Sequence, residues 1–125
     1  MSTFIYRVAN EDDDGPYTSE VSTDLAEHLC THGANPRTPP AVCEGHFPSD
    51  LDFYAFVDVE SFERWFTPYE RWLLKADGFH LYMMVVEDIR WLGNSGQCTY
   101  RIADAVRVAK LPVWDEGCRD ALQTA

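Results

Sequence analysis

The feature that most constrains this chain is a large excess of negative charge on an apolar content that is ordinary for a folded domain. Its 125 residues contain 21 Asp and Glu against 10 Lys and Arg, a formal net charge of -11 at pH 7. A chain with so much charge stays disordered when it is poor in apolar residues, but here 46% of the residues are hydrophobic and 14% are aromatic. The chain therefore has enough apolar material for a core, and we expect the surplus carboxylates on a folded surface.

This charge restricts the class of partner. A negative surface repels the phosphates of nucleic acids and attracts basic protein surfaces, because summed charge governs long-range association. The seven glycines never fall in a phosphate-binding pattern, so hydrolysis of a nucleoside triphosphate is not expected. Two interpretations of the acidic surface stay open: it serves solubility alone, or it is a dedicated binding face for a basic protein.

The sequence favours a single cytoplasmic domain over residues 1–125, because one core usually forms in chains of about 100 to 200 residues. No apolar run is long enough for a membrane span, and Met1–Asn10 lacks the pattern of a signal peptide, so we expect no membrane partner. Residues 33–50 contain four of the seven prolines and are predicted to form a long loop.

Hydrophobic periodicity predicts an α+β domain with a mixed or mainly antiparallel sheet and helices packed mostly on one face. The strands are expected at Thr3–Val8, Leu51–Val57, Phe79–Glu87, Gln97–Ile102 and Ala105–Leu111. Helices are expected at Val21–Thr31, from Val59 to Phe66, from Pro68 to Gly78 and, at the C-terminus, over Trp114–Leu122. Gln97–Ile102 is the returning strand of a predicted hairpin, after a turn at Leu92–Gly96.

The helix starts carry the clearest local signals. Asp58 is a suitable N-cap for the helix after the second strand, and Thr67, Pro68 and Glu70 form a capping box with proline at the first helical position. The apolar stripe of this second helix, which we expect to pack on the sheet, consists of Tyr69, Trp72, Leu73 and Ala76.

The cysteines allow two interpretations. Cys30 and His32, together with Cys43 and His46, could close a tetrahedral zinc site, because thiolates and imidazoles at close spacing are zinc ligands. The spacing matches no strong zinc signature, and packed, inert thiols are the alternative. A reactive thiolate is not expected, because a negative field raises the pKa of a thiol.

The polar loop after the first strand is the candidate partner-binding segment. It contains four consecutive acids, Glu11, Asp12, Asp13 and Asp14, before a Gly-Pro breaker. The run lacks the spaced ligands of a calcium loop, so a solvated acidic loop is one interpretation. The other is a phosphate mimic whose fixed carboxylates occupy a partner's nucleic-acid groove.

Three patches of the sequence resemble small phage and prophage proteins of uncharacterised function. They are Tyr6-Arg7-Val8 with Gly15-Pro16-Tyr17, the strand Phe53–Val57 running into Ser61–Phe66, and Gly78-Phe79 followed by a hairpin to Gly96-Gln97. In size and charge the chain also resembles anti-CRISPR and other anti-defence inhibitors of phages, several of which are acidic and occupy nucleic-acid-binding surfaces. The resemblance implies an inhibitor that acts in the cytoplasm of a host cell.

The layout also resembles the ADP-ribosyltransferase fold, in which a first-strand Arg or His contacts NAD, a middle strand carries a Ser or Tyr and a late strand supplies a catalytic Glu. Arg7 matches the first position and Tyr54 the second, while Gln97 stands near the third. A Gln cannot supply the carboxylate charge that stabilises an oxocarbenium-like centre. The resemblance thus implies either an NAD-using transferase or a non-catalytic relative in which Arg7 and Tyr54 are structural.

Two functions follow from the sequence. The first is an interaction protein that needs no cofactor and binds, and inhibits, a basic nucleic-acid-handling host protein through Glu11–Asp14 and further acids. The second is an NAD-using transferase with Arg7, Tyr54 and Gln97 at its site. A third alternative is a structural accessory protein whose fold is held by a zinc ion.

Overall fold

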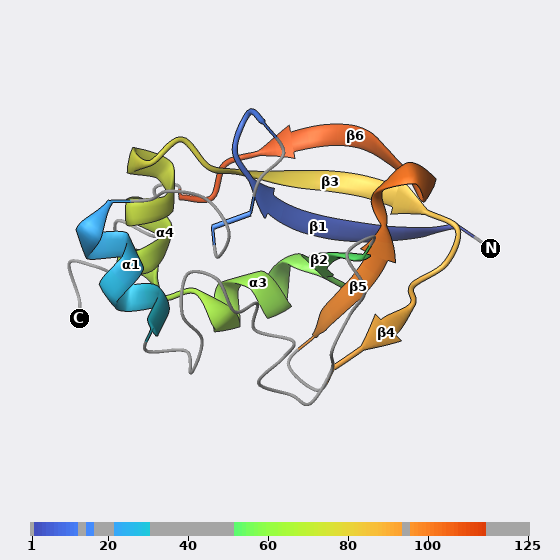
Figure 1. Ribbon diagram of the computed structural model, residues 1–125, viewed down its shortest axis with the longest axis horizontal. Coiled ribbons are helices and arrows are strands. Elements are labelled where there is room, and N and C mark those ends of the chain that lie inside the picture. The colour runs from blue at the N-terminus through green and yellow to red at the C-terminus, as the bar shows by residue number, and fades with distance from the viewer. Residues whose placement is uncertain (1, 13–14, 17–21, 31–51, 94–95, 115–125) are drawn as a thin grey trace.

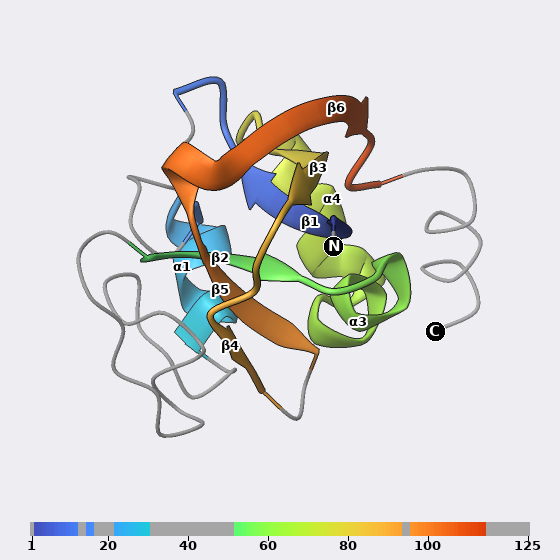
Figure 2. The same ribbon diagram turned by 90° about the vertical axis from the view of Figure 1, so that its right-hand side faces the viewer.

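The computed structural model describes residues 2–12, 15–16, 22–30, 52–93 and 96–114. Among them, six strands form one sheet in the order β4-β5-β2-β1-β3-β6, and every neighbouring pair is antiparallel. The strands are β1 (Thr3–Ala9), β2 (Asp52–Phe56), β3 (His80–Val86), β4 (Trp91–Leu92), β5 (Gln97–Arg101) and β6 (Ala105–Leu111). The predicted α+β class with an antiparallel sheet is confirmed, and Figure 2 shows β4 and β6 at opposite edges.

The first strand of the chain lies in the middle of the sheet. β1 pairs with β2 on one side, where Tyr6 faces Phe56, and with β3 on the other, where Arg7 faces Tyr82. The predicted hairpin forms between β4 and β5, but β4 has only two residues and β5 pairs along its whole length with β2. The sheet therefore depends on pairings between segments that are far apart in the sequence.

Three α-helices occur in the described residues, α1 (Thr23–Cys30), α3 (Val59–Trp65) and α4 (Pro68–Ala76), and a short 3-10 helix spans Ile102–Asp104. Figure 1 shows α1 beside α4 at one end of the sheet and α3 beside β2. Asp58 caps α3, because its Oδ1 accepts a hydrogen bond from the Ser61 N–H at 2.7 Å. No helix in this part of the chain is long and apolar enough to cross a membrane.

The predicted capping box is confirmed at the start of α4. The Glu70 N–H donates to Thr67 Oγ1 at 3.3 Å, and the Thr67 N–H donates to Glu70 Oε1 at 2.8 Å. Both donors would otherwise lack a partner within the helix. The helix ends before Gly78, whose φ of 85° is a left-handed conformation that glycine adopts without strain.

The core lies on both faces of the sheet. On one face, Val8, Phe56 and Leu81 pack against helical side chains that include Leu25, Phe62, Phe66, Leu73 and Leu74. On the other face, a separate cluster contains Ile5, Ala9, Ala55, Tyr82, Met84, Cys98 and Tyr100. The helices therefore pack on one face, as predicted, and we call this side the helical layer.

The predicted apolar stripe of α4 is wrong in part. Leu73 is buried as expected, but Tyr69 and Trp72 are 40% and 44% exposed, and Ala76 is exposed. The helix instead buries its charged Glu70 and Arg71, together with Leu73 and Leu74. The capping box explains this rotation, because Glu70 must turn back to the start of the helix and side chains three and four positions later share its face.

Two predicted elements cannot be compared with the structure. The Pro-rich loop at 33–50 lies outside the described residues. The predicted C-terminal helix shares only Trp114 with them.

Candidate functional site

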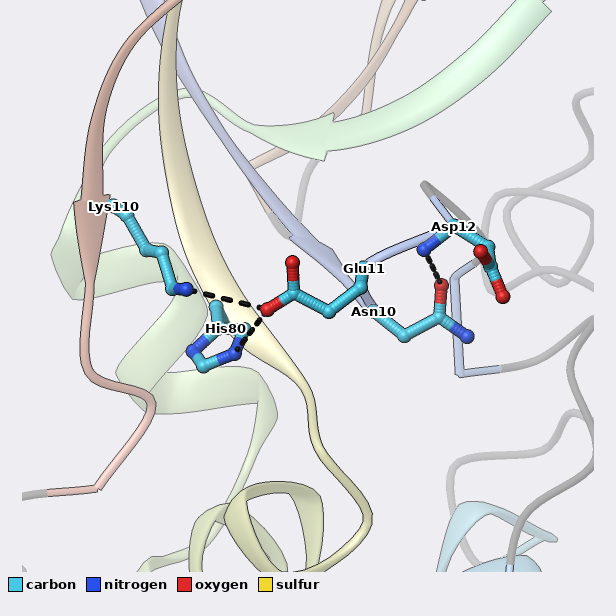
Figure 3. A network of polar contacts seen from close by, with 5 residues as sticks. All are labelled: Asn10, Glu11, Asp12, His80 and Lys110. Carbon is cyan, nitrogen blue, oxygen red and sulfur yellow. Dashed lines mark hydrogen bonds and ion pairs between the residues drawn. The ribbon is translucent and has the colours of Figure 1, made fainter.

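The acidic loop after β1 is tied to the sheet by its first carboxylate. Glu11 Oε1 lies 3.3 Å from Lys110 Nζ and 3.3 Å from His80 Nε2 (Figure 3). The three residues meet because β1 ends where β3 begins and β6 ends. The hydrogen bond and charge of Lys110, with a smaller contribution from His80, hold the pKa of Glu11 below its usual value.

The rest of this loop contributes one more described acid. Asp12 is exposed, and its N–H donates to Asn10 Oδ1 at 2.9 Å, which fixes the turn (Figure 3). Asp13 and Asp14 lie outside the described residues. Of the four predicted partner-binding acids, Glu11 therefore shares its charge with cations of the same molecule, and Asp12 faces solvent.

Exposed carboxylates also gather on the helical layer, where sequence analysis assigned no site. Its exposed acids are Asp24, Glu27, Asp58, Glu60 and Glu63, and its exposed bases are Arg64 and Lys75. Helix α1 packs on α4, and the Ser22 N–H donates to Asp77 Oδ2 at 2.8 Å, so the acids of α1 stay close to α4. We call these five exposed carboxylates the helical acids.

The opposite face of the sheet carries cations. Side chains alternate between the two faces along a strand, so Arg7, His80 and Lys110 project from the face of the second core cluster. Arg107 joins them, with its guanidinium 3.7 Å from the centre of the Tyr82 ring. Glu11 pairs with two members of this group, His80 and Lys110. Among the described residues, this face therefore carries a group of cations, whereas the exposed charges of the helical layer are mostly acids.

The three residues of the predicted transferase site do not face one space. Arg7 is 6% exposed, donates from Nη1 to the Tyr54 main-chain oxygen at 2.9 Å, and lies 4.7 Å from the centre of the Phe53 ring. The side chains of Tyr54 and Gln97 project from the helical face, because Ala55 and Cys98, opposite each other, belong to the second cluster. Arg7 thus contacts the backbone of Tyr54 but lies across the sheet from both side chains.

The described cysteine side chain is inert. Cys98 is fully buried on β5, and burial raises the pKa of its thiol to about 12, so it is neutral at physiological pH. The predicted zinc ligands His32, Cys43 and His46 lie outside the described residues, as does the side chain of Cys30. No cluster of three His, Cys, Asp or Glu side chains suited to a metal ion occurs in the part that is described.

Sequence analysis missed a pair of exposed aromatic rings. Tyr69 and Trp72, one turn apart on α4, stack with ring centroids 6.2 Å apart and planes inclined by 13°. The periodicity assigned both to the core. The signal that could have corrected this is the capping box, because a Glu70 that turns inward rotates these two rings outward.

The comparison with family models decides the relationship. The model described as the Bacteriophage T4 Y00F protein matches residues 1–114. The chain belongs to this phage protein family. Neither the comparison with curated proteins nor that with solved structures found a match.

The family description names a phage and no activity, so the chemistry of this Y00F-family chain must be judged from its side chains. The described residues bring together neither the predicted transferase triad nor a reactive thiol. They do provide a layer of exposed carboxylates with two stacked aromatic rings.

Proposed function

We propose that this Y00F-family protein binds a basic, nucleic-acid-handling protein or complex of the host and inhibits it, as an anti-defence protein would. The observation that carries the proposal is the concentration of the helical acids on one side of the molecule, away from the cations of β1, β3 and β6. A face with an excess of one sign attracts a surface of opposite charge over a longer range than evenly mixed charges do.

Inhibition would follow from competition for one site. Carboxylates held on helices occupy the positions that phosphates take on a basic groove, and nucleic acid is then excluded. The helices supply the required rigidity, because the caps Asp58 and Thr67 and the contact of Ser22 with Asp77 fix their ends. Asp12 and the rest of the Glu11–Asp14 loop are proposed as a second, weaker contact, since Glu11 already pairs with Lys110.

The proposal is tested with the full chain immobilised as bait in host lysate. We expect it to capture basic nucleic-acid-binding proteins at about 50 mM salt, and to release them at about 500 mM, where the Debye length falls to a few ångströms. Added duplex DNA should compete with the bait. Capture that is unaffected by salt and by DNA would refute the electrostatic basis of the proposal.

A charge variant sharpens this test. The variant replaces four helical acids by their amides, in the substitutions Asp24→Asn, Glu27→Gln, Glu60→Gln and Glu63→Gln. Its matched control replaces exposed acids at the end of β3, in the substitutions Glu87→Gln and Asp88→Asn. We expect the first variant to lose capture and the second to retain it. The control removes two charges and the first variant four, so a control loss of about half the first would mean that net charge alone, and not the helical layer, determines binding.

The NAD-using transferase stays a prediction. No described contact favours it, because Arg7 lies across the sheet from the side chains of Tyr54 and Gln97. Incubation of the protein and host lysate with labelled NAD tests it, and transfer of label that Arg7→Lys abolishes would establish it.

A further inference from the structure

Helix α4 displays its two largest aromatic side chains to solvent. Tyr69 is 40% exposed and Trp72 is 44% exposed, and their nearly parallel rings form one flat surface. Aromatic residues bury more apolar area than any others, so two neighbouring ones on a surface mark an interaction site more often than isolated apolar residues do.

Contacts on the other side of α4 hold Tyr69 and Trp72 in these exposed positions. Leu74 is completely buried, and Glu70 is held inward by its hydrogen bond to the Thr67 N–H. Arg71 lies 3.8 Å from Glu63 and 6.0 Å from the centre of the Phe62 ring. A rotation that buried Tyr69 and Trp72 would break all of these contacts, so the rings are held outward on a rigid element.

We infer that Tyr69 and Trp72 form the apolar anchor of the partner contact and accept arginine or lysine side chains of the basic partner; this inference rests on the function proposed above. A guanidinium or ammonium group is attracted to the face of an aromatic ring, most strongly to that of tryptophan. The same helix already has such a contact, with Lys75 Nζ 5.1 Å from the centre of the Trp114 ring.

The charge of the helical layer favours a basic partner at these rings. Of the exposed charged side chains on this layer, α3 carries Glu60, α1, which packs on α4, carries Asp24 and Glu27, and α4 itself carries Lys75. Exposed aromatic rings on a layer with more exposed acids than bases are suited to a basic partner. A second copy of the chain is disfavoured as the occupant, because two layers with the same excess of negative charge would repel each other.

The inference is tested with fluorescently labelled oligoarginine as the probe and anisotropy as the measurement. We expect Trp72→Ala to weaken binding by about tenfold, as for an anchor residue, and Trp72→Phe to lose less because a ring remains. The matched control is Val106→Ser, which removes an exposed apolar side chain from the edge strand β6, outside the helical layer's α-helices. Thermal unfolding of each variant checks that the fold is retained.

The salt dependence separates this inference from the proposed function. Loss of the rings should lower affinity equally at all salt concentrations, whereas loss of the helical acids should flatten the salt dependence. If Trp72→Ala binds oligoarginine as the unaltered protein does while the acid variant fails, the anchor is refuted and the proposed function stands. If neither variant changes binding, both fail. Dimerisation in sedimentation runs that Trp72→Ala abolishes would assign the rings to a second copy and overturn the inference.

Discussion

Replacing Gly96 by alanine tests how the β4–β5 turn contacts α3. Gly96 has a φ of 85°, and a Cβ built on it would lie 2.5 Å from Ser61 Cβ and still closer to the Ser61 hydroxyl. Side chains do not approach so closely, so the turn or the helix must move. The turn cannot move freely, because the Val57 N–H donates to the Gly96 main-chain oxygen at 2.9 Å.

Gly78 provides a matched control. It has the same φ of 85°, but an added Cβ there would have no atom within 4 Å. Alanine in this left-handed region costs about 1 to 2 kcal/mol, and both substitutions carry that cost. Gly96→Ala adds a steric overlap, for which forced packing typically costs about 1 to 3 kcal/mol more. We therefore expect a free energy of unfolding lower by about 1 to 2 kcal/mol for Gly78→Ala and by about 2 to 5 kcal/mol for Gly96→Ala.

The measurement is equilibrium unfolding in urea, with comparable m-values showing that the same surface is exposed on unfolding. The further substitution Ser61→Gly removes the overlapping atoms, so it should recover about 1 to 3 kcal/mol in the Gly96→Ala background and nothing in the Gly78→Ala background. If the two alanine variants lose the same stability, or if Ser61→Gly recovers none of the extra loss, the contact between this turn and α3 is refuted.

The remaining predictions concern single side chains. Thr67→Ala removes half of the capping box and should lower the free energy of unfolding by about 1 kcal/mol in urea titrations; an unchanged midpoint would contradict the role of the cap. Cys98 should resist alkylation in peptide mapping of the native protein at pH 8 and react once urea unfolds it, because burial raises the pKa of its thiol to about 12. The hydrogen bonds from Ser61 lower the pKa of Asp58 below its ordinary value of 3.8, so its stabilisation is complete above that value and is lost as the pH falls through the lower, folded-state pKa. Asp58→Asn should therefore flatten the acid limb of the plot of stability against pH, and an identical limb would mean that the Asp58 charge does not stabilise the cap.

Local signals in the sequence were sufficient for most of the elements. The alternation in Thr3–Val8 and Ala105–Leu111 predicted two strands within one residue of their observed bounds, because side-chain alternation is a property of each strand alone. The caps at Asp58 and Thr67 were also predicted, since a cap involves residues only two or three positions apart. Such features do not depend on how the chain folds as a whole.

Pairing and rotation needed information that the local sequence does not contain. The turn at Leu92–Gly96 predicted a hairpin, but no local signal shows that the other edge of β5 pairs with β2. The periodicity of α4 placed Tyr69 and Trp72 in the core, because hydrophobicity alone cannot show that Glu70 occupies the inward face. The error arose from treating a capping carboxylate as a surface residue.

The same limitation changes the argument about function. In the sequence, Glu11 begins a run of four acids and has no visible counter-charge. In the fold, the antiparallel register brings Lys110 and His80 to its carboxylate, from positions about 100 and 70 residues away. This pairing leaves the net charge of the molecule unchanged, but it changes which acids are available to a partner. Among the described residues, the acids proposed as the main contact are those of α1 and α3, and they belong to the same helical layer as the two rings that α4 turns outward, so charge and apolar contact would act on the same partner.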